Sequence, residues 1–223
     1  MTAERIVLVG GLWLDPARWH DVVAELAARG RDAVAVTLPV HRSATLEDQV
    51  AAVLAAVDAA PGPAVVAGHS AACGLAWLAA DARPERVSRV AMIGGYPRED
   101  GQSYGDFFEI SEGWMPFPGW AAFDGPDSAD LDERARQEFE SGAVPVPEGV
   151  ARGRIRYTDQ RRYDVPVVMI CPEYSPEQAR EWITAGRLPE LSRAKHVDLV
   201  DIESGHWPML TRPAELARIL AAL

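Results

Sequence analysis

A short stretch of small and apolar residues, 64–74 (AVVAGHSAACG), constrains the fold of this chain more than any other. Its first part, Ala64–Ala67, is a continuous apolar run, which is typical of a strand covered on both faces. A long apolar helical pattern begins directly after Ser70. The stretch therefore predicts a buried strand that turns sharply into a helix, with Ser70 exposed at the tip of the turn. Gly68 and Ala72 flank the serine and must be small, because the strand and the helix nearly touch there.

The surroundings of Ser70 suit a nucleophile, and a simple helix cap is the structural alternative. The start of the following helix leaves N–H groups free beside the serine oxygen, which favours binding of an oxyanion. Ala72 stands where G-x-S-x-G has its second glycine, and this departure adds only one methyl group.

Strands and helices alternate along most of the chain. Apolar runs predict further strands at 6–9, 33–36, 87–93, 165–170 and 197–202. Helical patterns cover 17–28, a segment between Thr45 and Pro61, 176–184, 188–194 and 213–223. This alternation predicts right-handed crossovers and a three-layer α/β/α sandwich around a mostly parallel sheet of about six strands. At 223 residues, we expect a single domain, 1–223.

The alternation breaks between the fourth and fifth predicted strands. Residues 97–164 are dense in Gly, Pro and aromatic residues and contain a charged helical segment, 128–141. An insertion of this length is usually functional, and its position predicts a cap over Ser70. Its aromatic residues are expected to form a small core of their own and also to line a pocket. Its basic residues are expected to form a solvated face or to pair with the acidic surface, and a substrate clamp is the alternative: Arg152, Arg154, Arg156, Arg161 and Arg162.

Composition argues against several classes of protein. The net charge is −11 and basic residues form no run, so nucleic acid is not an expected partner. Cys73 and Cys171 form neither a disulfide framework nor a metal-ligand spacing, and we expect two small buried hydrophobic residues in a reducing compartment. The N-terminus has no apolar signal region, and His69 and Ser70 interrupt the longest apolar stretch, 65–80. We therefore expect a cytoplasmic protein, monomeric or homodimeric, without a membrane span or a metal.

His206 is the histidine best placed to activate Ser70. It follows the last predicted strand directly, and loops after parallel strands gather at one edge of the sheet. A serine hydroxyl needs a neighbouring base to take its proton. His20 and His196 are expected at the surface, and His69 points away from the serine at an elbow. For the oxyanion, the sequence predicts two N–H donors, those of Ala71 and of Leu12 in the glycine-containing loop after the first strand.

Three motifs carry a resemblance to a known family. They are GGLW at 10–13, GHSAA at 68–72 and GHWPMLTRP at 205–213, and PREDGQS at 97–103 adds a fourth likeness. With these motifs the chain resembles the α/β-hydrolase superfamily, and more narrowly its methyl-esterase and hydroxynitrile-lyase-like branch with small bacterial esterases. The resemblance covers the sheet, about two-thirds of the chain, and implies a Ser–acid–His triad without metal or cofactor.

The acid of the triad departs from the family pattern. The family places an aspartate a few residues after the strand that ends here at Ile170, where this chain has Tyr174 or Ser175. Glu173 comes one or two residues early, and its longer side chain can still reach His206, so we interpret it as the orienting acid. The alternatives are a water or Ser175 in its place. Glu99 and Asp100 are further choices that suit a turn better.

The resulting prediction is a serine hydrolase that cleaves a carboxylic ester of a small apolar or aromatic molecule. Substrate contacts are expected from Gly11, Trp13, His69, Trp114, Trp120 and Trp207, although any one tryptophan is more commonly a core residue. The first alternative is a hydroxynitrile-lyase-like enzyme, but Trp207 occupies the place of that branch's lysine. The second is a non-catalytic ligand-binding relative, which the absent aspartate suggests.

Overall fold

Six parallel strands form the main sheet, in the order β2-β1-β3-β4-β7-β8. The computed structural model, which describes residues 4–223, places them at β1 Arg5–Val9, β2 Ala33–Ala35, β3 Ala64–His69, β4 Val87–Ile93, β7 Val167–Cys171 and β8 Val197–Asp201. Every residue of β3 and β7 is buried, as their apolar runs predict, whereas the edge strands β2 and β8 are partly exposed. The predicted parallel sheet of about six strands is confirmed.

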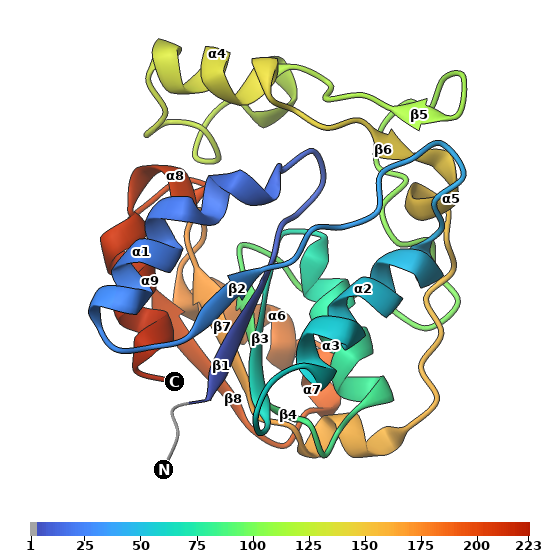
Figure 1. The fold of residues 1–223 in the computed structure, drawn as a ribbon, viewed down its shortest axis with the longest axis vertical. Helices are drawn as coiled ribbons and strands as arrows, with labels where there is room; N and C mark the ends of the chain where they lie inside the picture. The colour runs from blue at the N-terminus through green and yellow to red at the C-terminus, as the bar shows by residue number, and fades with distance from the viewer. Residues whose placement is uncertain (1–3) are drawn as a thin grey trace.

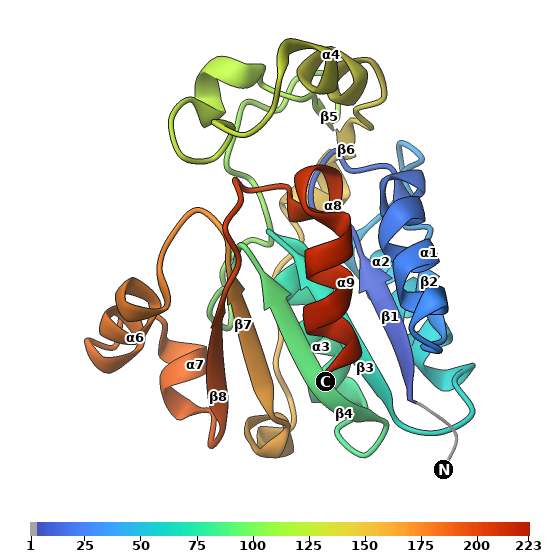
Figure 2. The same cartoon turned by 90° about the vertical axis from the view of Figure 1, so that its left-hand side faces the viewer.

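Helices cover both faces of this sheet, which gives three layers (Figures 1 and 2). α1 (His20–Ala28) and α9 (Pro213–Ala221) lie together on one face. α2 (Leu46–Asp58) and α3 (Ala72–Ala82) lie on the other. Beyond β7 the chain forms α6 (Pro176–Thr184) and α7 (Pro189–Arg193), and α8 (Pro208–Thr211) follows β8. The α/β/α sandwich predicted from the alternation is therefore confirmed.

Local sequence explains where several helices begin. Thr45 and Asp48 form a capping box at the start of α2, and Ser175 and Gln178 form another at the start of α6. The helix predicted at 17–28 is instead a 3₁₀ turn, Pro16–Trp19, that continues into α1. Asp15 causes this entry, because its carboxylate accepts the N–H of Ala17 at 2.7 Å.

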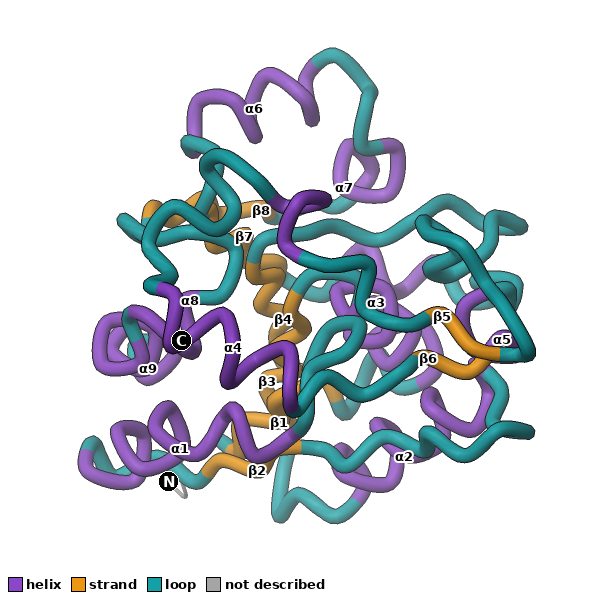
Figure 3. The backbone as a smooth tube through the Cα atoms, turned by 90° about the horizontal axis from the view of Figure 1, so that it is seen from above, coloured by secondary structure: helices purple, strands orange, loops and turns teal. Residues whose placement is uncertain are grey.

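Most of the segment between β4 and β7 lies over the carboxyl ends of the strands (Figures 1 and 3). Its last part returns to the opposite end of the sheet, where β7 begins (Figure 1). It contains β5 (Trp114–Met115), 3₁₀ turns at Trp120–Phe123 and Gln160–Asp164, α4 (Glu133–Ser141), β6 (Val146–Pro147) and α5 (Glu148–Ala151). The antiparallel pair β5–β6 was not predicted, since each strand has only two residues. The charged helix begins at Glu133 rather than 128, because Arg136 donates hydrogen bonds to the carbonyls of Ser128 and Leu131 and holds 128–131 as a turn.

Seven aromatic residues join this insertion to the rest of the molecule. Trp13 from the loop after β1 and Trp207 before α8 contact aromatic rings of the insertion, with ring centroids 5.3–6.0 Å apart. The insertion supplies the other five rings: Phe108, Phe117, Trp120, Phe123 and Phe139. Edge-to-face packing of this kind fixes the insertion against the sheet's carboxyl edge.

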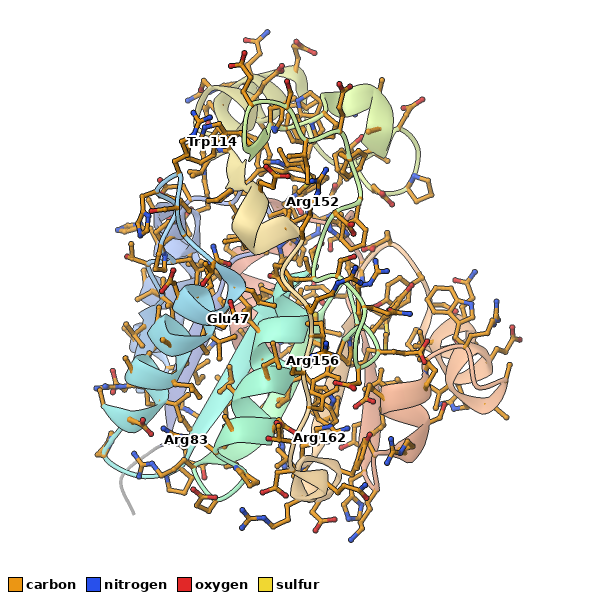
Figure 4. All side chains as sticks on the ribbon, turned by 90° about the vertical axis from the view of Figure 1, so that its right-hand side faces the viewer. Glu47, Arg83, Trp114, Arg152, Arg156 and Arg162 are labelled. Atoms are coloured by element: carbon orange, nitrogen blue, oxygen red, sulfur yellow. The ribbon has the colours of Figure 1, made fainter. Side chains whose placement is uncertain are left out.

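A buried ionic cluster fastens the other end of the insertion. The guanidinium of Arg162 contacts the carboxylates of Asp81 on α3 and Glu190 on α7 at 3.2 and 3.0 Å. All three residues are 5% exposed or less. Asp81 also accepts the N–H groups of Thr158 and Asp159. Arg162 thus pairs with acidic residues, which is one of the two predicted roles, but it does so in the interior and not on a solvated face. Figure 4 shows it at the opposite end of the molecule from Trp114.

Three further predictions concern the cysteines, a membrane span and the N-terminus. Cys73 and Cys171 are buried free thiols, as expected, and burial raises the pKa of Cys171 to about 12. Within residues 4–223, no helix has both the length and the apolarity needed to span a membrane. The expectation that the N-terminus lacks a signal region concerns residues 1–3 in part, and these lie outside the described residues.

Candidate active site

Ser70 stands at a strained turn between β3 and α3. Its φ is 54°, in the left-handed region that residues with a Cβ rarely adopt. A Cβ at Gly68 would overlap the carbonyl oxygen of Ala72, and one at Gly95 would lie 2.5 Å from the carbonyl oxygen of Ser70. These two glycines therefore let three backbone segments meet around the serine. The methyl group of Ala72 fits into the core without exposure, so the departure from a second glycine is accommodated.

Two backbone amides lie next to the serine. Ala71 follows it directly, and Gly11 brings the loop after β1 so close that a Cβ there would be 3.0 Å from the Ser70 Cβ. Leu12 follows Gly11 in this loop. Over residues 4–223, the N–H groups of Leu12 and Ala71 have no hydrogen-bond acceptor. The structure thus brings the two sequence-predicted oxyanion donors to the same place, with their N–H groups free.

His206 and Glu173 meet at the same edge of the sheet. Nδ1 of His206 lies 2.8 Å from Oε1 of Glu173, and the two side chains are only 13% and 14% exposed. Glu173 follows β7 and His206 follows β8, as the sequence analysis expected. A Cβ at Gly94 would lie 3.3 Å from His206 Nδ1, so the glycine pair 94–95 contacts the imidazole on one side and the serine backbone on the other. This arrangement leaves Nε2 of His206 as the nitrogen available to Ser70.

Residues 202–207, which connect β8 to α8 and which we call the histidine loop, have their backbone held from two directions. His69 approaches from the elbow, with Nε2 2.8 Å from the carbonyl oxygen of His206. The insertion approaches through residues 127–130, which we call the cap loop. Its Asp127 carbonyl accepts the N–H of His206 at 2.7 Å, and its Asp130 carboxylate accepts the N–H of Gly205 at 2.8 Å. A Cβ at Gly205 would overlap both residues of the cap loop, so glycine is required there.

Electrostatics in this region disfavour extra charge. Burial, together with the nearby His206, lowers the pKa of His69 well below its ordinary value. Burial and the charge of Glu173 raise the pKa of Asp127, against an opposing effect of His206. Nδ1 of His69 is buried without a hydrogen-bond partner, so the neutral imidazole donates through Nε2 to the His206 carbonyl. We conclude that His69 supports the histidine loop in its uncharged form.

The lowered pKa of His69 gives a prediction for stability against pH. Below pH 6.5, the ordinary pKa of histidine, His69 binds a proton in the unfolded chain but stays neutral in the folded protein. Its contribution to the free energy of unfolding is therefore fully present above pH 6.5 and decreases as the pH falls below that value. In urea unfolding, the wild type is expected to lose up to about 1.4 kcal/mol per pH unit more than His69→Gln below pH 6.5. Glutamine retains an N–H donor without a titrating ring, so parallel pH profiles for the two proteins would contradict this account.

A cavity of about 750 Å³ opens beside the serine. Ser70, Ala71 and Glu173 line it together with four aromatic side chains, namely Tyr96, Phe107, Tyr174 and Trp182. The sequence does not single out these aromatic residues as substrate contacts. Their position in the sequence could have identified them, because they follow β4 and β7, and ligands bind at the carboxyl ends of parallel strands.

None of the six predicted substrate contacts lines this cavity. Trp13, Trp120 and Trp207 belong to the aromatic cluster that joins the insertion to the sheet, and Trp114 lines a separate surface hollow with Pro116 and Val144. Gly11 lies against the serine from the loop side, and His69 is 1% exposed beneath the histidine loop. The structure thus brings Ser70, His206, Glu173, Ala71 and Leu12 to the same edge of the sheet. Three of the four predicted tryptophans pack in the aromatic cluster instead. Within the described residues, no group of three or more His, Cys, Asp or Glu side chains is arranged to hold a metal ion.

Comparisons with known proteins agree with this architecture. The model of the alpha/beta hydrolase family matches residues 6–219. An extracellular alpha/beta-hydrolase from a Paenibacillus species, described as a structural and functional homologue of tobacco salicylic acid binding protein 2, has a TM-score of 0.76 at 17% identity and 98% coverage of both chains. A methylesterase from Arabidopsis has a TM-score of 0.70 at 14% identity, covering 99% of this chain and 98% of its own.

A third solved structure, tomato methylketone synthase I with 2-tridecanone, has a TM-score of 0.73 at 14% identity and covers 100% of this chain and 98% of its own. At identities this low, the structural likeness establishes the shared fold alone. No curated protein matches the chain. The family match spans nearly all of the sequence and agrees with the sheet order and the serine elbow, so the chain belongs to the alpha/beta hydrolase family.

Proposed function

We propose that this protein is a serine hydrolase that cleaves carboxylic esters through an acyl-enzyme. The observation that carries the proposal is the 2.8 Å contact between Glu173 Oε1 and His206 Nδ1, beside a serine held at a φ of 54°. A carboxylate on Nδ1 fixes the imidazole in the tautomer whose Nε2 can accept a proton. This is the arrangement that converts a serine hydroxyl into a nucleophile.

In the proposed reaction, Ser70 Oγ attacks the acyl carbon while His206 Nε2 takes its proton. The negative charge that develops on the carbonyl oxygen is stabilised by the N–H groups of Ala71 and Leu12. The C–O bond to the alcohol breaks as His206 returns the proton to the leaving oxygen. A water molecule then attacks the acyl-serine by the same route, which releases the carboxylic acid and restores Ser70.

The cavity supports an apolar or aromatic substrate of modest size. Its volume of about 750 Å³ lies in the range of small-molecule sites, and four aromatic side chains line it. Among the structural relatives, the Arabidopsis protein is a methylesterase, which agrees with ester chemistry on this fold. The proposed preference for an apolar or aromatic substrate rests on Tyr96, Phe107, Tyr174 and Trp182, and not on the tryptophans predicted from the sequence.

Neither alternative function has an observation in its favour. A hydroxynitrile-lyase-like reaction would use a lysine where Trp207 stands, and that indole is 2% exposed among the rings of the aromatic cluster. A non-catalytic ligand-binding role was suggested by the absent aspartate. The contact of Glu173 with His206 removes that reason.

Covalent labelling with a fluorophosphonate probe tests the proposal. We expect the wild type to be labelled at Ser70, with the adduct located by peptide mass spectrometry, and Ser70→Ala to remain unlabelled. Ser43→Ala removes an exposed hydroxyl that does not line the cavity and is expected to label like the wild type. Labelling of Ser70→Ala at the wild-type rate, or a wild type that neither labels nor hydrolyses aryl esters, would overturn the proposed function.

A further inference from the structure

Two arginines line the cavity beside Ser70. Arg98 lies in the insertion shortly after β4, and Arg187 lies in the connection between α6 and α7, which follows β7. The guanidinium groups therefore come from two separate segments at the carboxyl ends of neighbouring strands. In residues 4–223, neither arginine forms an ion pair, although the protein carries an excess of eleven acidic charges.

Each guanidinium packs on an aromatic ring that also lines the cavity. Cζ of Arg98 lies 5.1 Å from the ring centroid of Phe107, and Cζ of Arg187 lies 5.9 Å from that of Trp182. Arg98 Nε also donates to Oε1 of Gln102 at 3.2 Å. Stacking uses the face of a guanidinium and leaves its N–H edge available for a planar anion.

The acidic groups of the lining do not neutralise these two cations. Glu173 is engaged by His206. Glu99 is exposed, and its Oε1 accepts from Nε2 of Gln102 at 3.4 Å. A free anion is repelled by the net charge of −11, so a ligand with a carboxylate gains most where local cations offset that field.

We propose that the cavity binds esters that carry a second, remote carboxylate, with the ester at Ser70 and the carboxylate on Arg98 and Arg187. This inference rests on the proposed ester hydrolysis and adds a substrate class to it. The two guanidinium groups bind the anion through charge-assisted hydrogen bonds, while the aromatic walls contact the apolar part between the two ends. The arginines act as specificity residues and take no part in the proton transfers.

The test compares 4-nitrophenyl butyrate with 4-nitrophenyl hydrogen glutarate, which differ by a terminal carboxylate. We expect the wild type to have the higher kcat/KM on the glutarate ester. Arg98→Gln and Arg187→Gln are each expected to raise KM for that ester about tenfold and to affect the butyrate ester, which has no carboxylate, much less. The preference is expected to weaken as salt is added. Arg180→Gln removes an exposed arginine of α6 that does not line this cavity and serves as the matched control.

A third ester, 4-butyryloxybenzoate, carries the carboxylate on the phenol. Selective loss on this ester in the two variants would assign the anion to the alcohol side, and selective loss on the glutarate ester would assign it to the acyl side. Equal effects of both substitutions on charged and neutral esters would overturn the subsite while ester hydrolysis stands. Unchanged turnover of the butyrate ester by Ser70→Ala would instead overturn the proposed function.

Discussion

Glu173→Gln is expected to lower kcat for ester hydrolysis by about 10⁴-fold with little change in KM, as loss of the acid does in serine-protease triads. Glutamine preserves the size of the side chain but presents an amide to Nδ1 of His206, in place of the carboxylate oxygen now 2.8 Å away. The imidazole then loses the partner that fixes its tautomer and stabilises its protonated form. Steady-state kinetics on an aryl ester, with fluorophosphonate labelling rates beside them, measures the effect.

Two further substitutions make this prediction specific to the Glu173 carboxylate. Glu173→Asp keeps the charge but shortens the side chain by one methylene. We expect most of the activity to be lost, because the longer glutamate side chain is what brings the carboxylate to 2.8 Å from His206 Nδ1. Ser175→Ala removes the hydroxyl considered as an alternative orienting group, and since it caps α6 we expect lower stability with unchanged kcat. A Glu173→Gln enzyme within tenfold of wild type, or a Ser175→Ala enzyme as poor as expected for Glu173→Gln, would refute the assignment.

Arg162→Met is expected to destabilise the fold by about 3–5 kcal/mol, because it leaves two buried carboxylates without their cation. Asp81 and Glu190 are 4% and 5% exposed, and Trp77 Nε1 and the Tyr163 hydroxyl already donate to Glu190. The cluster binds the end of the insertion to α3 and α7, so its loss should loosen both. Urea unfolding followed by tryptophan fluorescence measures the change.

The neighbouring Arg161 provides a matched control. Its guanidinium is largely exposed and pairs with Asp159 at the surface, where ion pairs contribute little. Arg161→Met is therefore expected to unfold at nearly the wild-type urea concentration. Equal midpoints for the two variants would show that the ionic cluster does not stabilise the fold as we infer.

Sequence alone predicted those features that follow from the parallel sheet. Ser70, His206 and Glu173 each follow a strand closely, and the ends of parallel strands meet at one edge whatever the intervening chain does. The replacement of the family's aspartate by Glu173 could also be predicted, since a longer side chain can compensate for a position one or two residues earlier in the sequence. The family and the sheet were predicted correctly on this basis, while the catalytic roles stay predictions.

The insertion was less predictable, because it has no periodicity that fixes which way its side chains face. Trp120 packs on Trp207 and Phe139, and the sequence does not show that these rings meet. Phe107, by contrast, is 49% exposed at the cavity, although it belongs to the same aromatic-rich stretch. The burial of Arg162 was not predictable for a related reason, since its two carboxylate partners are 81 and 28 residues away in the sequence.

The contacts of the cap loop limit how the insertion can be exchanged between relatives. Asp127 and Asp130 accept N–H groups from His206 and Gly205, so the insertion that lines the cavity also holds the backbone of His206. A chimera with another family member's insertion must bring oxygen acceptors to both positions. Without them, the transplanted pocket would face a displaced imidazole and would bind substrate without turning it over.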